Sequence, residues 1–129
     1  MLILICGLPR AGKTTLASKY EPKYNVIHLD SCGFLGNPYR DVKKKLSETE
    51  GDVIVEGVYY KLRDRQELLD TYQGDIKKCV WLDTPKEMKK GRHGYSSRCE
   101  FHFDIPTKDE GWDEIYHVTN GEFDLECIL

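Results

Sequence analysis

The sequence predicts a three-layer α/β domain with a mainly parallel sheet of five strands. Short apolar runs of strand length alternate with amphipathic stretches of helix length, and glycine, proline or asparagine stands at most junctions. This alternation is typical of a sheet covered by helices on both faces. With 129 residues the chain suits one compact domain, and we expect residues 1–129 to form it.

Each expected strand is an apolar run with polar or turn-forming neighbours. The first runs directly into Gly7, and the third lies between polar residues, as expected for a strand buried on both faces. The hairpin-type turn Asn120-Gly121 allows residues 122–128 to add an antiparallel edge strand. The five main strands are expected at residues 2–6, 26–29, 53–55, 79–82 and 114–118.

The helices are indicated by their ends and by apolar residues at helical spacing. Pro22 ends the first helix, and Asn37-Pro38 gives the second a cap and a first-turn proline. Residues 84–87 form a capping box with proline at the first helical position, so a fourth helix should begin there. The helices are expected at residues 13–20, 38–50, 63–72 and from 85 onward.

Charge is distributed unevenly along the chain, although the net charge is only −3. Residues 99–129 hold nine acidic residues against Lys108 alone, while residues 77–98 hold seven basic residues against two acidic ones. The basic segment suits either an anionic ligand held at one place or a solvated face. Five scattered cysteines indicate neither a disulfide framework nor a zinc site and favour a reducing cytoplasm. No apolar run approaches the roughly 18 residues of a membrane span, so we expect no membrane partner.

Residues 7–14, Gly-Leu-Pro-Arg-Ala-Gly-Lys-Thr, match the phosphate-binding pattern G-x-x-x-x-G-K-[ST] in full. The match lies between a predicted strand and a predicted helix, which is the context that the motif requires. Glycines let backbone N–H groups converge on phosphate oxygens, and the following helix directs its positive dipole end at them. Lys13 would bridge the outer phosphates and the Thr14 hydroxyl would hold Mg²⁺. The loop therefore predicts nucleoside-triphosphate binding.

Three classes of protein use this loop: switches, motors and phosphotransferases. A GTPase switch normally carries a guanine-reading Asn-Lys-x-Asp, which this sequence lacks, and a motor needs more than 129 residues for a lever or an oligomer interface. A small kinase needs only a base, a carboxylate near the magnesium and a cationic lid in addition to the loop. We therefore interpret the chain as a kinase.

Two acidic residues at strand ends are candidates for the first two of these parts. Asp30, which closes the second strand, would orient the acceptor hydroxyl and accept its proton; its alternative role is to cap the turn that follows. Glu56, which follows the third strand, would lie beside Thr14 and hold a metal-bound water, or it may only begin the next loop.

The lid is expected at about residues 86–98. Arg92 and Arg98 would close over the transferring phosphoryl group and neutralise its developing charge, and a solvated helix end is the alternative. The aromatic residues Tyr59 and Tyr60 suit stacking on a base of the substrate, and equally suit the core.

Together these features resemble the 5′-hydroxyl kinase domain of polynucleotide kinases, especially viral ones. The loop, Asp30, the stretch Val53-Ile-Val-Glu-Gly, the stretch Trp81-Leu-Asp-Thr-Pro and residues 103–115 occur in the family's order. The most family-like segment is Pro-Thr-x-x-Glu-Gly-Trp-x-x-Ile at residues 106–115. The resemblance implies a P-loop NTPase fold of the kinase type, ATP and Mg²⁺ as cofactors, and the cytoplasm as compartment (the host's, if the protein is viral).

The resemblance also implies the roles of individual residues. Some family members place an arginine three residues after the base to hold the acceptor's phosphate; here that position is Gly33, and Arg40 or Arg63 are the candidates to replace it. The expected catalytic residues are Asp30, Lys13 and Arg92, the metal residues Thr14 and Glu56, and the substrate residues Asp30, Arg40 and Tyr59. The expected nucleotide-binding residues are Gly7, Leu8, Pro9, Arg10, Ala11, Gly12, Lys13, Thr14, Thr15, Arg92 and Arg98.

Three functions remain open from the sequence. The leading one is an ATP-dependent kinase for the 5′-hydroxyl of DNA or RNA. The second is a kinase for a nucleoside, a nucleotide or another small metabolite, which the acidic pI near 5.8 and the short chain favour. The third is a nucleotide-binding interaction protein without transfer activity, whose acidic C-terminal part would be a partner surface.

Overall fold

The computed structural model describes residues 1–8, 11–32, 37–83, 103–119 and 123–129. Five parallel strands form one sheet in the order β2-β3-β1-β4-β5, which confirms the predicted parallel α/β fold. The first strand therefore occupies the centre, as expected for the most apolar run of the chain. The strands are β1 (Leu2–Cys6), β2 (Asn25–His28), β3 (Val53–Gly57), β4 (Lys77–Leu82) and β5 (Glu114–Val118).

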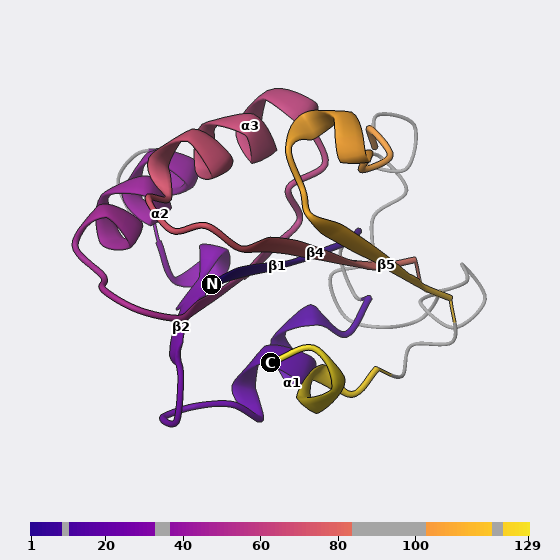
Figure 1. The fold of residues 1–129 in the computed structure, drawn as a ribbon, viewed down its shortest axis with the longest axis horizontal. Helices are drawn as coiled ribbons and strands as arrows, with labels where there is room; N and C mark the ends of the chain where they lie inside the picture. The colour runs from indigo at the N-terminus through magenta and orange to yellow at the C-terminus, as the bar shows by residue number, and fades with distance from the viewer. Residues whose placement is uncertain (9–10, 33–36, 84–102, 120–122) are drawn as a thin grey trace.

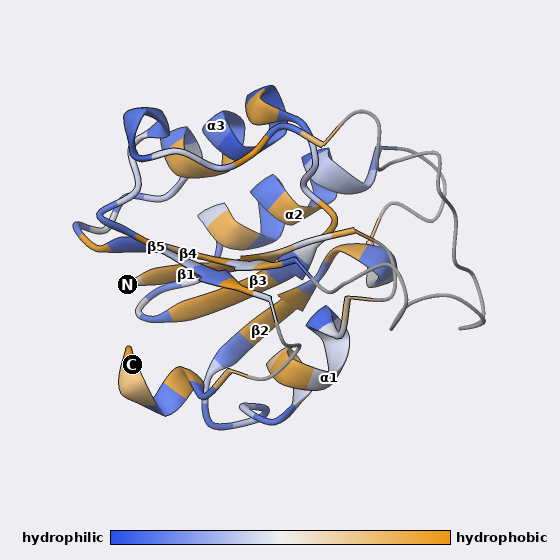
Figure 2. Cartoon of the chain, turned by 90° about the vertical axis from the view of Figure 1, so that its right-hand side faces the viewer, coloured by the Kyte–Doolittle hydropathy of each residue, from blue (hydrophilic) through white to orange (hydrophobic). Residues whose placement is uncertain are grey.

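Helices cover both faces of this sheet (Figure 1). The helices α2 (Pro38–Ser47) and α3 (Leu62–Thr71) lie on one face, and α1 (Lys13–Ser18) lies on the other beside the C-terminus. Successive residues of a strand point to opposite faces, so β1 divides its side chains between two core clusters. Figure 2 shows the result: the sheet is predominantly hydrophobic between helices whose outer sides are hydrophilic.

Hydrogen bonds to side chains cap the N-termini of α2 and α3. The Asn37 side chain accepts a hydrogen bond from the backbone nitrogen of Tyr39 at 3.0 Å, and Pro38 follows at the first helical position, as predicted. The first residue of α3, Leu62, donates its backbone N–H to Asp104 Oδ2 at 2.9 Å. The α3 N-terminus is thus capped by a residue 42 positions away in the sequence, a contact that no local pattern indicates.

The C-terminal residues do not form the antiparallel edge strand that the sequence allowed. Asp124 accepts a hydrogen bond from the backbone of Glu126 at 2.9 Å and begins the 3₁₀ helix η4 (Leu125–Cys127). Leu125 and Ile128 are buried in the same core cluster as α1, so this segment covers a face of the sheet and extends no edge. The predicted turn at residues 120–121 and the helix predicted from residue 85 lie outside the described residues. No described helix combines the length and the apolarity that crossing a membrane requires.

Candidate functional site

The loop between β1 and α1 has the backbone that its two glycines were predicted to allow. A side chain at Gly7 would place its Cβ only 2.5 Å from the carbonyl oxygen of Leu82, at the end of β4, so a glycine is required there. Gly12 has φ of 98°, in the left-handed region that favours glycine, and directly precedes α1. Of the predicted loop residues, Pro9 and Arg10 lie outside the described part of the chain.

Lys13 lies across this loop instead of extending into solvent. Its side chain is buried, and Nζ donates a hydrogen bond to the carbonyl oxygen of Leu8 at 2.9 Å. Ala11 is buried beneath the loop in the α1 core cluster, whereas the side chain of Thr15 is exposed. The ammonium group is therefore held over the turn whose N–H groups the motif uses for phosphate.

Glu56 lies next to Thr14, as predicted. It is a residue of β3, however, whereas the sequence analysis placed it after the end of that strand. Its side chain is only 2% exposed, and Oε1 accepts a hydrogen bond from Thr14 Oγ1 at 3.2 Å. The alternative reading of Glu56 as the first residue of a surface loop is wrong. A buried carboxylate against the hydroxyl of the loop is costly to keep unless it has partners, and the structure supplies a second one.

The second partner is His28, which the sequence analysis left without a role. Nδ1 of His28 lies 2.9 Å from Glu56 Oε1, and Nε2 contacts Glu21 on the solvent side. Burial lowers the pKa of His28, but the hydrogen bonds to the two carboxylates outweigh burial and leave the pKa above its ordinary value. The pairing of His28 with Glu56 in the β2–β3 register explains the contact. In the sequence, the signal for this contact was the position of a histidine two residues before Asp30.

The Thr14 and Glu56 pair fits a Mg²⁺ ion held together with nucleotide phosphates. Because Thr14 donates its proton to Glu56, the lone pairs of its oxygen can face a cation. Hydroxyl, carboxylate and phosphate oxygens are the ligands that Mg²⁺ uses in such sites. Within the described ranges, three or more His, Cys, Asp or Glu side chains nowhere form a cluster able to hold a metal by themselves.

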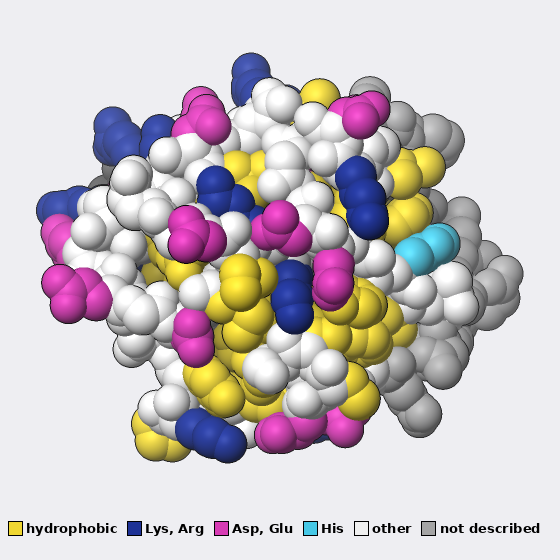
Figure 3. Space-filling model, in the orientation of Figure 1, with side chains coloured by type: hydrophobic (Ala, Val, Ile, Leu, Met, Phe, Trp, Pro, Cys, Tyr) yellow, Lys and Arg dark blue, Asp and Glu magenta, His cyan; other side chains and the backbone are white. Residues whose placement is uncertain are grey.

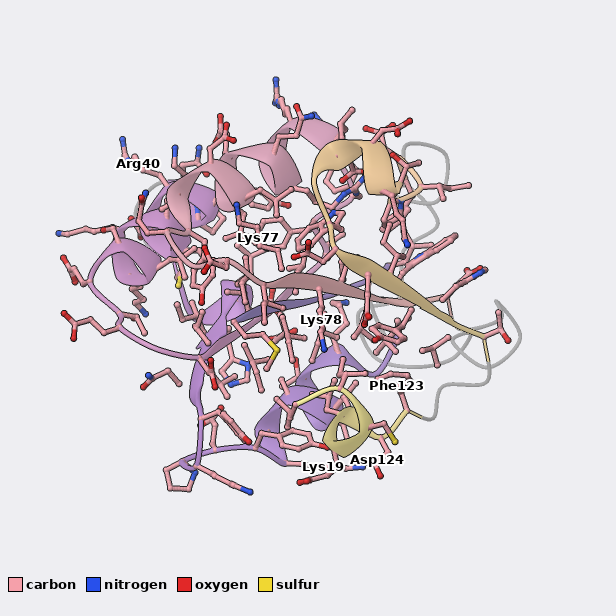
Figure 4. The ribbon with its side chains drawn as sticks, in the orientation of Figure 1. Lys19, Arg40, Lys77, Lys78, Phe123 and Asp124 are labelled. Atoms are coloured by element: carbon pink, nitrogen blue, oxygen red, sulfur yellow. The ribbon has the colours of Figure 1, made fainter. Side chains whose placement is uncertain are left out.

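The predicted substrate residues are scattered in the structure. Asp30 lies in the short 3₁₀ helix η1 (Leu29–Ser31), just after β2, and its carboxylate is exposed. Arg40 is exposed on the outer side of α2, turned away from the sheet (Figure 4). Asp30 therefore occupies the edge of the sheet where β1 runs into the loop, and Arg40 belongs to the outer surface. The lid arginines Arg92 and Arg98 lie outside the described residues.

Tyr59 is a core residue, so the prediction that it stacks on a substrate base is corrected. Its side chain is 1% exposed, and its ring packs edge-on against Tyr39 with centroids 5.1 Å apart. Burial raises the pKa of its phenol well above the ordinary value. Its neighbour Tyr60 is the half-buried member of the pair that was proposed from the sequence.

Tyr60 lines a pocket at the N-terminus of α3. The pocket has a volume of about 740 Å³ and lies where the chain leaves β3, at the carboxyl edge of the sheet. The loop approaches the same place, because the backbone N–H of Gly7 donates to the carbonyl oxygen of Val58 at 3.4 Å. The lining residues are Tyr60, Lys61, Leu62, Arg63, Gln66, Phe103 and Asp104. Arg63, one of the two arginines considered for the acceptor, thus lines this pocket, whereas Arg40 is not among its lining residues.

Behind this pocket lies a buried ion pair that the sequence analysis missed. Arg65 is fully buried and makes two hydrogen bonds to Glu110, from Nε at 2.8 Å and from Nη2 at 3.1 Å. Its Nη1 donates to the carbonyl oxygen of Tyr59 at 2.7 Å. Glu110 also accepts from the Trp112 indole at 3.2 Å and from the backbone of Thr107 at 2.8 Å. The segment that looked most family-like is therefore held against α3 by this pair.

Comparison with known proteins shows the fold. No protein-family model matches the sequence, and a search of curated proteins gives no match. Among solved structures, a sugar kinase from Janibacter sp. HTCC2649 superposes with a TM-score of 0.70 at 15% identity, covering 98% of this chain and 88% of that one. A gluconokinase from Sinorhizobium meliloti 1021 gives 0.69 at 16%, covering 94% and 83%. Shikimate kinase from Aquifex aeolicus gives 0.59 at 18%, covering 99% and 90%. The chain has the P-loop NTPase fold of these proteins.

Proposed function

We propose that the chain is an ATP-dependent phosphotransferase that moves the γ-phosphate to a hydroxyl group. The observation that carries the proposal is the arrangement at the β1–α1 loop: Lys13 lies over the turn while Thr14 is bound to the buried carboxylate of Glu56. A cation for the phosphates and oxygens for a metal are thus side by side. The fold shared with solved kinases supports the same reaction class.

The chain's residues divide the work of in-line transfer in this proposal. Lys13 would exchange its hydrogen bond to Leu8 for the phosphate oxygens, and Thr14 would hold Mg²⁺, which would supply positive charge to the phosphates. Asp30 orients the acceptor hydroxyl and takes its proton. Arg92 and Arg98 belong to the proposed lid. Asp30 is suited to this task because its carboxylate is exposed next to β2.

For the acceptor we propose a small hydroxyl-bearing metabolite, such as a sugar, a sugar acid or a nucleoside. The pocket of about 740 Å³ beside Tyr60 and Arg63 is the size that small-molecule sites have. On the face seen in Figure 3, Lys and Arg side chains are interspersed with Asp and Glu side chains. Solved sugar kinase and gluconokinase structures superpose on this chain.

A second candidate acceptor is the 5′-hydroxyl of a polynucleotide. It is favoured by the resemblance of the segment 103–115 to polynucleotide kinases, a segment whose Glu110 binds Arg65 behind the pocket. The terminal nucleotide of a strand would place its base against Tyr60 and its phosphate against Arg63 in the same pocket.

The test is transfer of label from γ-labelled ATP, with Mg²⁺, to a panel of sugars, sugar acids, nucleosides, nucleoside monophosphates and a 5′-hydroxyl oligonucleotide. Labelling of a small acceptor ahead of the oligonucleotide supports the first candidate, and the reverse order supports the second. Nucleotide binding with no transfer to any acceptor would support an interaction protein instead and contradict the proposal.

Two variants with matched controls test the residue roles. Lys13→Ala should abolish nucleotide binding, whereas Lys19→Ala, which removes a lysine at the exposed end of α1 (Figure 4), should not. Asp30→Ala should abolish turnover and leave ATP affinity within about 3-fold, because a general base acts mainly in the transition state. Asp70→Ala on α3 is its control. Normal turnover by Asp30→Ala would remove the base from the mechanism.

A further inference from the structure

Four polar side chains form one chain of hydrogen bonds that begins at the loop. Thr14 Oγ1 donates to Glu56 Oε1 at 3.2 Å, His28 Nδ1 lies 2.9 Å from the same oxygen, and His28 Nε2 contacts Glu21. Exposure increases outward: the side chains of Glu56, His28 and Glu21 are 2%, 20% and 45% exposed. The buried member is therefore Glu56, and both ends of the chain are exposed, Thr14 at the loop and Glu21 before β2.

The ring of His28 is fixed from both sides. Each ring nitrogen faces a carboxylate oxygen, and a carboxylate can only accept, so the protonated ring donates to both carboxylates. The ring comes from β2 and the inner carboxylate from β3, where His28 and Glu56 are register partners. Glu21, from the segment before β2, prevents the ring from turning away. The neighbouring strands β2 and β3 thus determine the direction of the Glu56 carboxylate.

We propose that His28 is a positioning residue for the metal site of this chain, acting through Glu56. This inference rests on the proposed function. The Nδ1–H donor of His28 holds Oε1 of Glu56 against the Thr14 hydroxyl. Thr14 therefore donates its proton to Glu56, and the lone pairs of its oxygen face the cation. Without the donor, the buried carboxylate has one partner and can rotate, and the hydroxyl loses its fixed direction. Partners of this kind orient metal ligands in many metalloproteins.

The test measures metal affinity directly, with Mn²⁺ in place of Mg²⁺. Binding of Mn²⁺ is followed by its electron paramagnetic resonance signal in the presence of a non-hydrolysable ATP analogue. His28→Leu removes the donor at similar volume and should weaken Mn²⁺ binding by about 10-fold or more, the usual effect of losing an outer-shell partner. His28→Asn places an amide N–H near the Nδ1 position and should stay within about 3-fold of the unmodified protein by the same reasoning.

His117→Asn is the matched control. His117 also pairs with a carboxylate, Asp83, at 2.8 Å, but it lies on β5, the opposite edge of the sheet from β2. It should leave Mn²⁺ affinity unchanged. Affinity for the ATP analogue without metal should be the same in all variants, because His28 is proposed to act only through the metal site.

The outcomes separate this inference from the proposed function. If the unmodified protein binds no Mn²⁺–nucleotide complex, the proposed function fails. If it binds and His28→Leu binds equally well, or if His28→Asn is as weak as His28→Leu, the positioning role is overturned and the proposed function stands. Should His28→Leu not fold, the ring ¹⁵N signals of the unmodified protein decide: a proton on Nδ1 that is perturbed by Glu56→Gln supports the role, and an unprotonated Nδ1 overturns it.

Discussion

The buried pair of Arg65 and Glu110 offers the sharpest test of the energetics of this fold. Arg65→Met removes three donors at once, two of which reach Glu110 and one of which reaches the Tyr59 carbonyl. Glu110 is 3% exposed and keeps only the Trp112 and Thr107 donors. Removing one partner of a buried pair costs about 3–5 kcal/mol. The two remaining donors place the expected loss at the lower end, about 3 kcal/mol.

The assay is equilibrium unfolding in urea and by heat, followed by circular dichroism. For a chain of this size 1 kcal/mol corresponds to roughly 3–6 °C, so a loss of about 3 kcal/mol should lower the midpoint by about 9–18 °C. The double variant Arg65→Met with Glu110→Leu removes the uncompensated charge and should recover part of the loss, because the Trp112 and Thr107 donors then lose their acceptor. The matched control is Lys43→Met, which breaks an exposed pair between α2 and Glu67 of α3 at 3.7 Å and should cost less than about 1 kcal/mol.

Two results would refute the reasoning. A loss below about 1 kcal/mol in Arg65→Met would mean that the pair behaves like a surface pair. A double variant that is destabilised by the sum of the two single losses would mean that the two side chains do not stabilise each other, and that the cost comes from packing alone.

Three further predictions concern single residues. Tyr59→Phe should raise stability by about 1 kcal/mol, because the buried Tyr59 hydroxyl has no hydrogen-bond partner within the described structure; a loss of stability in urea unfolding would contradict this. Gly7→Ala should lower stability by about 1–3 kcal/mol and weaken nucleotide binding, because its Cβ would meet the Leu82 carbonyl oxygen at 2.5 Å; calorimetry measures both, and an unaltered protein would refute the loop geometry. His28, whose pKa is raised by its carboxylate partners, should contribute stability that is complete below about pH 6.5 and is lost as the pH rises through the folded-state pKa. His28→Asn should flatten that part of the stability profile, and an unchanged profile would show that another group titrates there.

The strands and the loop could be predicted because their signals are local. Continuous apolar runs mark strands buried on both faces, and the phosphate-binding pattern fixes both its residues and its place between a strand and a helix. The end of β3 was harder to predict from the sequence. Glu56 is polar and reads as the start of a loop, yet it completes the strand because His28 and Thr14, which are distant in sequence, satisfy its carboxylate.

The missed features all depend on partners far along the chain. Arg65 and Glu110 are 45 residues apart, and His28 and Glu56 are 28 apart. At the C-terminus the hairpin-type turn allowed an edge strand, but Leu125 and Ile128, which are three residues apart, pack into the same core cluster at a 3₁₀ helix. A period of two and a single helical turn cannot be distinguished over so few residues.

The strand order also has a consequence for how the chain can fold as it is synthesised. Leu2 in the central strand pairs with Val53 on one side and Lys77 on the other. Because β1 precedes both of its neighbours in the chain, a nascent chain that ends before β4 exposes an apolar edge of β1 with unpaired N–H and C=O groups. Fragments that stop between β3 and β4 should aggregate, and slower translation across residues 58–76 should lengthen the time for which chaperones are needed.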